Sequence, residues 1–221
     1  MSGEMFDCAD PEQRQTGIAS AISALKGGRL VVMPTDTVYG IGADAFDGEA
    51  VAALLSAKGR GRDMPVPVLV GSWHTIQGLV YSVPNSAKEL IRAFWPGALS
   101  LVVRQAPSLQ WDLGDANGTV MLRMPLHPVA IELLREVGPM AVSSANISGR
   151  PAAVTAAQAR DQLGDLVETY LDGGPAEQQA ASTIVDLTGA HPRVLRQGPV
   201  TLDAIAAVLG VEAASLTAET E

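Results

Sequence analysis

The sequence predicts an α/β fold in which helices pack around one twisted sheet. Along the 221 residues, short apolar runs that suit buried strands alternate with segments of helical periodicity. No internal repeat and no low-complexity linker interrupts this alternation. Hydrophobic residues make up 47% of the chain, which is enough for one sizeable core. A single domain is therefore expected.

The first predicted helix has well-defined ends. Asp10 suits the N-cap, Pro11 the first helical position, and Gln13 can complete a capping box. Apolar residues then recur at helical spacing as far as Leu25, and the pair 27–28 of glycines ends the run. A helix from about residue 11 to residue 25 follows from this pattern.

The next element is a strand at 30–33, whose continuous apolar character is typical of a strand buried on both faces. The alternation continues to the end of the chain, and the strand order is left open. Further helices are expected near 49–57, 73–79, 85–94, 128–137, after the N-cap Thr155, and at 202–209. Further strands are expected near 66–70, 99–104, 119–124, 140–143, 169–172, 183–186 and 193–195.

The charge balance argues against a general nucleic-acid-binding protein. Lys and Arg number 15 against 24 Asp and Glu, and the formal net charge is −9, so a broad basic footprint is missing. The acidic N-terminus has no apolar signal region, and no apolar run approaches the ~18 residues of a membrane span. The single cysteine, Cys8, cannot form an internal disulfide. A cytoplasmic protein without membrane contact is expected.

The common cofactor and metal motifs are absent from the sequence. There is no G-x-x-x-x-G-K-[ST] loop, and no G-x-G-x-x-G follows a strand, so neither the usual nucleotide loop nor a Rossmann site is supported. The three histidines, His74, His127 and His191, fall in no metal-ligand spacing. No metal site built from protein side chains is assigned.

The segment 58–62, Lys-Gly-Arg-Gly-Arg, places three cations within five residues of an acidic chain. Cations held this close repel one another by roughly 1 kcal/mol per pair in water, and more when partly buried. A bound polyphosphate would relieve that repulsion, so the segment indicates a pocket for a small anion. A solvated surface loop is the alternative.

The segment 34–42 follows a buried strand, at the kind of position where ligands collect on open α/β sheets. Thr35 and Thr37 project to the same side if the segment is extended, and the glycines at 40 and 42 allow close approach of a ligand to the backbone. The segment therefore indicates a ligand wall. A hydrogen-bonded turn after the strand is the alternative.

Other strand ends repeat this design. Period-two geometry places a hydroxyl and a guanidinium, Thr119 and Arg123, on one face of a strand, although an exposed sheet edge would give the same pattern. The segment 143–151 carries three serines and an asparagine, which suit hydrogen bonds to adenine, ribose or phosphate, or else a plain Asx/Ser turn. The segments 182–186 and 194–198 also combine an apolar strand with hydroxyl or cationic residues, and the second has one arginine before a glycine.

Six motifs resemble those of the YrdC family in order and spacing. They are PTDTVYGIGADA (34–45), KGR (58–60), TVMLRMPLHP (119–128), SSANISGRPA (143–152), STIVDLT (182–188) and VLRQGPV (194–200). The resemblance covers about residues 14–209, which implies a single catalytic domain between an N-terminal segment 1–13 and a C-terminal tail 210–221. It also implies a twisted, open, mixed sheet with a concave, positively charged cavity.

The activity that the resemblance implies is that of an L-threonylcarbamoyladenylate synthase, a nucleotidyltransferase. Such an enzyme forms threonylcarbamoyl-AMP and pyrophosphate from L-threonine, bicarbonate and ATP, with Mg²⁺ accompanying the ATP. The product would pass to threonylcarbamoyl-transferase proteins, which modify the tRNA adenosine beside the anticodon. A transient contact with tRNA is part of the same expectation.

The resemblance also assigns site residues. Those expected on the threonine side are Thr35, Arg123, Ser144 and Ser182. Those expected on the ATP side are Lys58, Arg60, Thr119, Val142, Asn146, Ala152 and Arg196, with Lys58 and Arg60 as catalytic residues that neutralise the phosphates. Two positions depart from the family pattern: Met64 stands where a His or Asn is usual, and Ala152 where a serine is frequent.

Two other functions remain open at this point. One is a YrdC-like paralogue that acts on another carbamoyl or carboxyl substrate. The other is a non-catalytic module that binds tRNA or double-stranded RNA, against which the net charge of −9 weighs.

Overall fold

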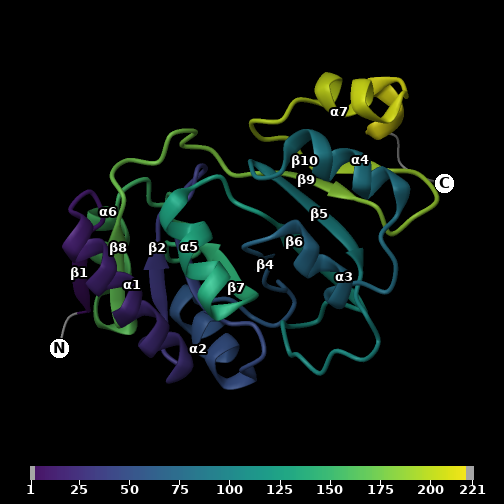
Figure 1. Cartoon of the computed structure of the whole chain (residues 1–221). Helices are drawn as coiled ribbons and strands as arrows, with labels where there is room; N and C mark the ends of the chain where they lie inside the picture. The colour runs from purple at the N-terminus through teal and green to yellow at the C-terminus, as the bar shows by residue number, and fades with distance from the viewer. Residues whose placement is uncertain (1–2, 218–221) are drawn as a thin grey trace.

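A computed structural model describes residues 3–217, which form ten strands and seven α-helices (Figure 1). The strands are β1 (Glu4–Asp7), β2 (Val31–Met33), β3 (Gly40–Asp44), β4 (Val68–Leu69), β5 (Leu99–Arg104), β6 (Thr119–Arg123), β7 (Met140–Ser144), β8 (Thr169–Asp172), β9 (Thr183–Asp186) and β10 (Arg193–Arg196). The helices are α1 (Pro11–Lys26), α2 (Gly48–Lys58), α3 (Ile76–Leu79), α4 (Asn85–Phe94), α5 (Pro128–Val137), α6 (Ala156–Leu163) and α7 (Leu202–Leu209).

All ten strands belong to one sheet, in the order β1-β8-β2-β3-β7-β4-β6-β5-β9-β10. The sheet is open, because β1 and β10 end it without pairing to each other. It is mixed: β5 runs parallel to β9, for example, and antiparallel to β6. The predicted α/β class with one open mixed sheet is therefore confirmed.

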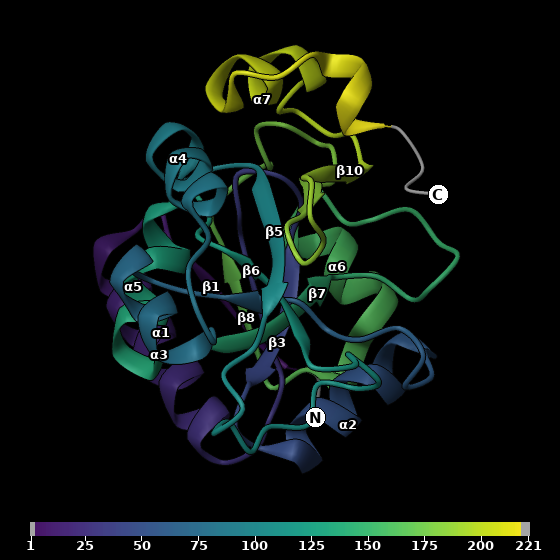
Figure 2. The same ribbon diagram turned by 90° about the vertical axis from the view of Figure 1, so that its right-hand side faces the viewer.

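Helices cover both faces of the sheet, and the sheet separates the hydrophobic core into two clusters. Figure 1 shows α1 and α5 side by side, and their apolar side chains pack with alternate residues of β2 and β7, such as Val31 and Val142. Helices α2, α4 and α6 pack on the larger cluster, which includes Val32 and Leu122. At one end of the molecule, α7 lies against α4 (Figure 2). Within residues 3–217 no helix combines the length and the apolar character that a membrane crossing requires.

Two strands were not predicted from the sequence. Strand β1 lies inside the segment 1–13 and pairs in parallel with β8, and a last 3₁₀ turn, Ala213–Leu216, lies inside the segment 210–221, whose residues 218–221 are outside the described part. Strand β3 contains two glycines, which are unfavourable in strands. They fit here, because a Cβ at Gly40 would lie 2.7 Å from Cγ1 of the buried Val142 on β7, a branched side chain with little freedom to move. Strand β3 can therefore lie close against β7.

A ten-residue crossing segment, residues 173–182, joins β8 to β9 past six intervening strands. The hydroxyl of the fully buried Tyr39 holds its start. It donates to the Gly174 carbonyl (2.6 Å) and accepts from the Gly173 N–H (3.1 Å), and the Asp172 carboxylate lies 3.2 Å away. Burial raises the pKa of Tyr39, so the hydroxyl stays a donor. One side chain thus anchors a connection that ends at the sheet's other half.

Replacing Tyr39 by phenylalanine is expected to lower the free energy of unfolding by about 1–3 kcal/mol, because the Gly173 N–H and the Gly174 carbonyl lose a buried partner. Urea unfolding measures the change. Tyr81→Phe is the matched control, since Tyr81 is 73% exposed and should give no measurable change. Equal urea midpoints for Tyr39→Phe and the wild type would contradict the anchoring role.

Candidate active site

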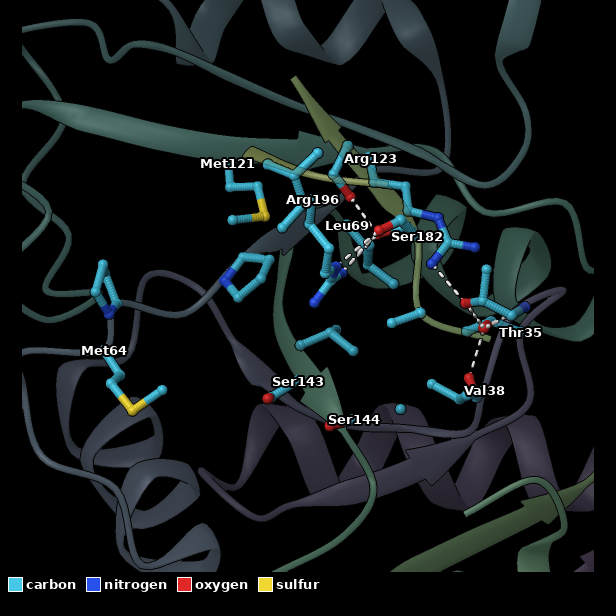
Figure 3. Close-up of a pocket in the computed structure, with 18 of the residues that line it drawn as sticks. Thr35, Val38, Met64, Leu69, Met121, Arg123, Ser143, Ser144, Ser182 and Arg196 are labelled. Atoms are coloured by element: carbon cyan, nitrogen blue, oxygen red, sulfur yellow. Dashed lines mark hydrogen bonds between the residues drawn. The ribbon is translucent and has the colours of Figure 1, made fainter. Parts of the chain in front are cut away.

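A pocket of about 460 Å³ opens on the middle of the sheet (Figure 3). Its walls come from β3, β7, β4, β6, β5, β9 and β10, which are consecutive in the strand order, and from the loops near them. Seven of the eleven predicted site residues line it: Thr35, Arg60, Arg123, Val142, Ser144, Ser182 and Arg196. The other four, Lys58, Thr119, Asn146 and Ala152, do not line this pocket. Segments far apart in sequence thus converge in one hollow.

The threonine segment forms a tight, buried turn beside the pocket. The hydroxyl of Thr35 donates to the Val38 carbonyl (2.6 Å), lies 3.0 Å from the hydroxyl oxygen of Thr37 and accepts the Thr37 N–H (3.2 Å). The turn that the sequence offered as an alternative is therefore present. Because Thr35 and Thr37 also line the pocket, the turn forms part of its wall.

Arg123, at the end of β6, is the most deeply held cation in the pocket wall. Its Nε donates to the Gly97 carbonyl (2.9 Å), Nη1 to the Thr37 hydroxyl (2.7 Å) and Nη2 to the Asp36 carboxylate (2.6 Å). Burial lowers the pKa of Arg123, the Asp36 carboxylate acts against that shift, and the Arg196 guanidinium adds to it. The chain therefore compensates this buried charge with a carboxylate of its own.

Lys58, at the end of α2, lies behind the pocket wall with no exposed surface. Its Nζ donates to the carbonyl of Ser144, to the carbonyl of Asn146 (2.8 Å) and to the amide oxygen of Asn146 (3.2 Å). Within residues 3–217 it forms no ion pair with a carboxylate. Burial, with a smaller contribution from Arg60, lowers the pKa of Lys58 to about 7. Lys58 thus holds the turn 144–146 in place from behind.

The other two cations of the 58–62 segment diverge. Arg60 lines the pocket, with Nε donating to the Ser148 hydroxyl (2.8 Å) and Nη1 to the Ser143 hydroxyl (3.2 Å), and burial lowers its pKa. Arg62 is exposed and donates to both carboxylate oxygens of Asp112 (2.7 and 2.9 Å). The two alternatives for this segment, an anion pocket and a solvated surface loop, therefore apply to different residues. Arg60 lines the pocket, and Arg62 lies in a solvated surface loop.

Arg196 lies at the same end of the pocket as Arg123. Its Nε and Nη2 donate to the Ser182 carbonyl (3.0 and 2.8 Å), and the Ser182 hydroxyl is 2.8 Å from that of Ser100. The sequence placed Arg196 on the ATP side and Ser182 on the threonine side, whereas the structure brings them into contact. Ser100 was not predicted, although its hydroxyl interrupts the apolar run 99–103 of strand β5 and was a usable signal.

The remaining predicted residues support the wall or flank it. The Thr119 hydroxyl donates to the Ala116 carbonyl (2.7 Å) and lines a smaller cavity of about 130 Å³, which shares Pro65 and Met121 with the main pocket. The Asn146 amide donates to the Arg150 carbonyl (2.8 Å), and Ala152 is half-buried outside the pocket lining. Met64, the departure noted above, lines the pocket with 48% of its surface exposed.

An open α/β sheet thus presents arginines and hydroxyls in one hollow, a composition that suits a small anionic ligand. The chain matches the family model Sua5_yciO_yrdC, described as "Telomere recombination", over residues 23–198. It belongs to this family.

Similar proteins span the chain almost completely. A Mycobacterium tuberculosis protein, provisionally named a threonylcarbamoyl-AMP synthase, is 82% identical over 213 residues, which cover 96% of this chain and 98% of that one. The Bacillus subtilis threonylcarbamoyl-AMP synthase is 38% identical, over 87% of this chain and 56% of its own length.

Solved structures show the same fold. Pyrococcus abyssi Sua5, solved with L-threonine, superposes with a TM-score of 0.87 at 33% identity, over 94% of this chain and 61% of that chain. The chain thus spans about three fifths of that protein. Escherichia coli YciO superposes with a TM-score of 0.81 over 92% of this chain and 99% of that one, and at 23% identity it supports the fold alone.

The buried Lys58 predicts a pH dependence of stability. Its folded-state pKa lies near 7 and its unfolded value near 10.5, so between these values the unfolded chain binds more protons and stability rises with pH. The wild type should gain stability relative to Lys58→Met from pH 7 to pH 9, by at most about 1.4 kcal/mol per pH unit. Urea unfolding at several pH values measures this, with the exposed Lys26→Met as control. Parallel curves for the wild type and Lys58→Met would contradict the shifted pKa.

Proposed function

We propose that the protein is a threonylcarbamoyl-AMP synthase, a nucleotidyltransferase that forms threonylcarbamoyl-AMP and pyrophosphate from L-threonine, bicarbonate and ATP. The 82% identity to a relative of that provisional name supports the reaction. The observation that carries it is one pocket with two cationic ends, Arg60 with Ser143 and Arg123 with Ser182. We infer that this pocket is positively charged, because three arginines and a single carboxylate, Asp63, line it.

The two ends suit two substrates. Arg60 is a planar donor that already contacts hydroxyl groups, and such a fork fits phosphate oxygens. At the other end Arg123 and Arg196 face the pocket beside the Ser100 and Ser182 hydroxyls, which fits an amino acid with a carboxylate and a hydroxyl. Ser144 lies between them on β7. We therefore place the triphosphate at the Arg60 end and threonine at the Arg123 end, and we reassign Arg196 to the threonine side.

The chemistry asks the protein for positioning rather than for a strong base. Bicarbonate supplies carbon dioxide by losing hydroxide, and the threonine amine adds to the carbon dioxide and loses a proton to give a carbamate. The hydroxide and the proton leave as water. A carbamate oxygen then attacks the α-phosphorus, and the bond to pyrophosphate breaks. Because the carbamate is already anionic, the side chains must align it and neutralise the phosphates, which fits a pocket of arginines and hydroxyls.

Mg²⁺ is proposed to arrive with ATP. Mg²⁺ is usually held by substrate phosphates and one or two carboxylates, and keeps several waters. Asp63 is the one carboxylate among the lining residues, and within residues 3–217 no group of three or more His, Cys, Asp or Glu side chains could hold a metal ion. The residues present fit a cation held chiefly by the nucleotide. When bound, it would neutralise charge on the phosphates.

The wider context belongs to the same proposal. The product would supply proteins that transfer the threonylcarbamoyl group to the tRNA adenosine beside the anticodon, in the cytoplasm, where tRNA and ATP are available. A transient contact with tRNA is proposed only locally, since the net charge of −9 opposes broad binding.

A pyrophosphate-release assay with ATP, bicarbonate and each amino acid in turn tests the reaction. L-Threonine should give the signal, and valine, which replaces the hydroxyl by a methyl group, should react at least ~100-fold more slowly because site hydroxyls lose their partner. Equal rates with valine would favour a paralogue for another carboxyl substrate. Salt-sensitive tRNA binding without threonine-dependent pyrophosphate would favour an RNA-binding module.

Arg60→Ala is expected to lower kcat/KM for ATP at least ~100-fold, because a phosphate-neutralising guanidinium is lost. Arg62→Ala is the matched control: it removes the same side chain two residues away, where Arg62 pairs with Asp112 at the surface. That control should stay within about twofold of the wild type. Similar losses in both variants would mean that Arg60 has no special place in the site.

A further inference from the structure

We propose that Asp36 is a positioning residue, which holds the Arg123 guanidinium so that its free N–H groups recognise the carboxylate of the amino-acid substrate. The inference rests on the function proposed above and names a residue that the sequence motifs did not assign to the site. It concerns the threonine end of the pocket alone.

The hydrogen bonds of Arg123 leave donors to spare. A guanidinium has five N–H groups, and three of them are used, by Gly97, Thr37 and Asp36. One N–H on each terminal nitrogen has no partner within residues 3–217. Arg123 lines the pocket and has 6% of its surface exposed, so we place these two donors toward the pocket. Two donors on one planar group match the two oxygens of a carboxylate.

Asp36 is itself held firmly. Its side chain is 4% exposed, and the oxygen that pairs with Arg123 also accepts the Leu126 N–H (2.9 Å). Its backbone carbonyl accepts the Gln178 N–H (3.0 Å) from the crossing segment. Two separate parts of the chain, the stretch after β6 and the crossing segment, therefore fix the position of Asp36, and Asp36 in turn orients Arg123.

The charge of Asp36 is needed as well as its position. Arg123 is buried, and the Arg196 guanidinium is close enough to act against its charged form. A buried cation without a partner is strongly unfavourable, so a neutral side chain at residue 36 would leave Arg123 free to turn toward other acceptors. Arg60, at the phosphate end, is held by Ser143 and Ser148 instead. A change at Asp36 should therefore affect the amino acid and leave ATP unaffected.

A comparison of L-threonine with L-threoninamide, in which the carboxylate is replaced by a neutral amide, separates this role from a general structural one. The wild type should prefer threonine over threoninamide by at least ~100-fold in kcat/KM. In Asp36→Asn we expect that preference to fall at least tenfold, with kcat/KM for threoninamide and KM for ATP each within about threefold of the wild type. The ratio of two substrates does not depend on how much of the enzyme is folded.

Glu132→Gln is the matched control, since it removes a carboxylate that pairs with an arginine, Arg14, and neither residue lines the pocket. It should keep the wild-type preference. If Asp36→Asn lowers kcat/KM for threonine and for threoninamide by the same factor, or lowers neither, the proposal is overturned. If Asp36→Asn does not fold, Asp36→Glu keeps the charge but displaces the guanidinium by about one methylene. In Asp36→Glu the preference for threonine over threoninamide should be at least threefold smaller than in the wild type. An unchanged preference in that variant would also overturn the proposal.

If the proposed synthase function were wrong, the experiment would give a different result from the one that overturns the role of Asp36. In that case the wild type itself would release no pyrophosphate in response to threonine, before any variant is compared. A threonine-dependent wild type with an unaltered Asp36→Asn preference would instead leave the synthase function standing and remove only the role of Asp36.

Discussion

Two cations held out of water determine the shape of the pocket. Burying a charge costs several kcal/mol unless nearby oxygens compensate for the lost hydration. For Lys58 those oxygens are the carbonyls of Ser144 and Asn146, and for Arg123 they belong to Asp36, Thr37 and Gly97. Because these groups belong to the turns around the pocket, satisfying the two charges also fixes those turns.

The two cations are compensated in different ways, which divides the pocket. Arg123 has a carboxylate partner, so the protein itself balances its charge. Lys58 has only dipolar oxygens, and Arg60 beside it donates to two serine hydroxyls. Within residues 3–217 neither Lys58 nor Arg60 forms an ion pair with a carboxylate, so the Arg60 end can offer its charge to a polyphosphate. The Arg123 end offers spare hydrogen-bond donors in a fixed orientation, which suits one carboxylate.

Much of this could be predicted from the sequence, and the exceptions have physical causes. Apolar periodicity was enough to predict α4, α5, β5 and β9, which the structure places at the predicted residues. Strand β3 could not be found that way, because its glycines are chosen for close packing on β7, a contact about 100 residues away in sequence. The different orientations of the Arg60 and Arg62 side chains could not be predicted either, because their hydrogen-bond partners, Ser143 and Asp112, are distant in sequence. Asp36 stood inside a recognised motif, but its role depends on Arg123, which only the folded sheet brings near.

The most direct test of the account is a crystal structure with L-threonine and an ATP analogue whose α,β-phosphate bridge cannot be cleaved. We expect phosphate oxygens within hydrogen-bond distance of Arg60 and the threonine carboxylate within hydrogen-bond distance of Arg123, with both ligands in the same hollow. A threonine carboxylate bound to Arg60, or a triphosphate bound at Arg123 and Arg196, would contradict it.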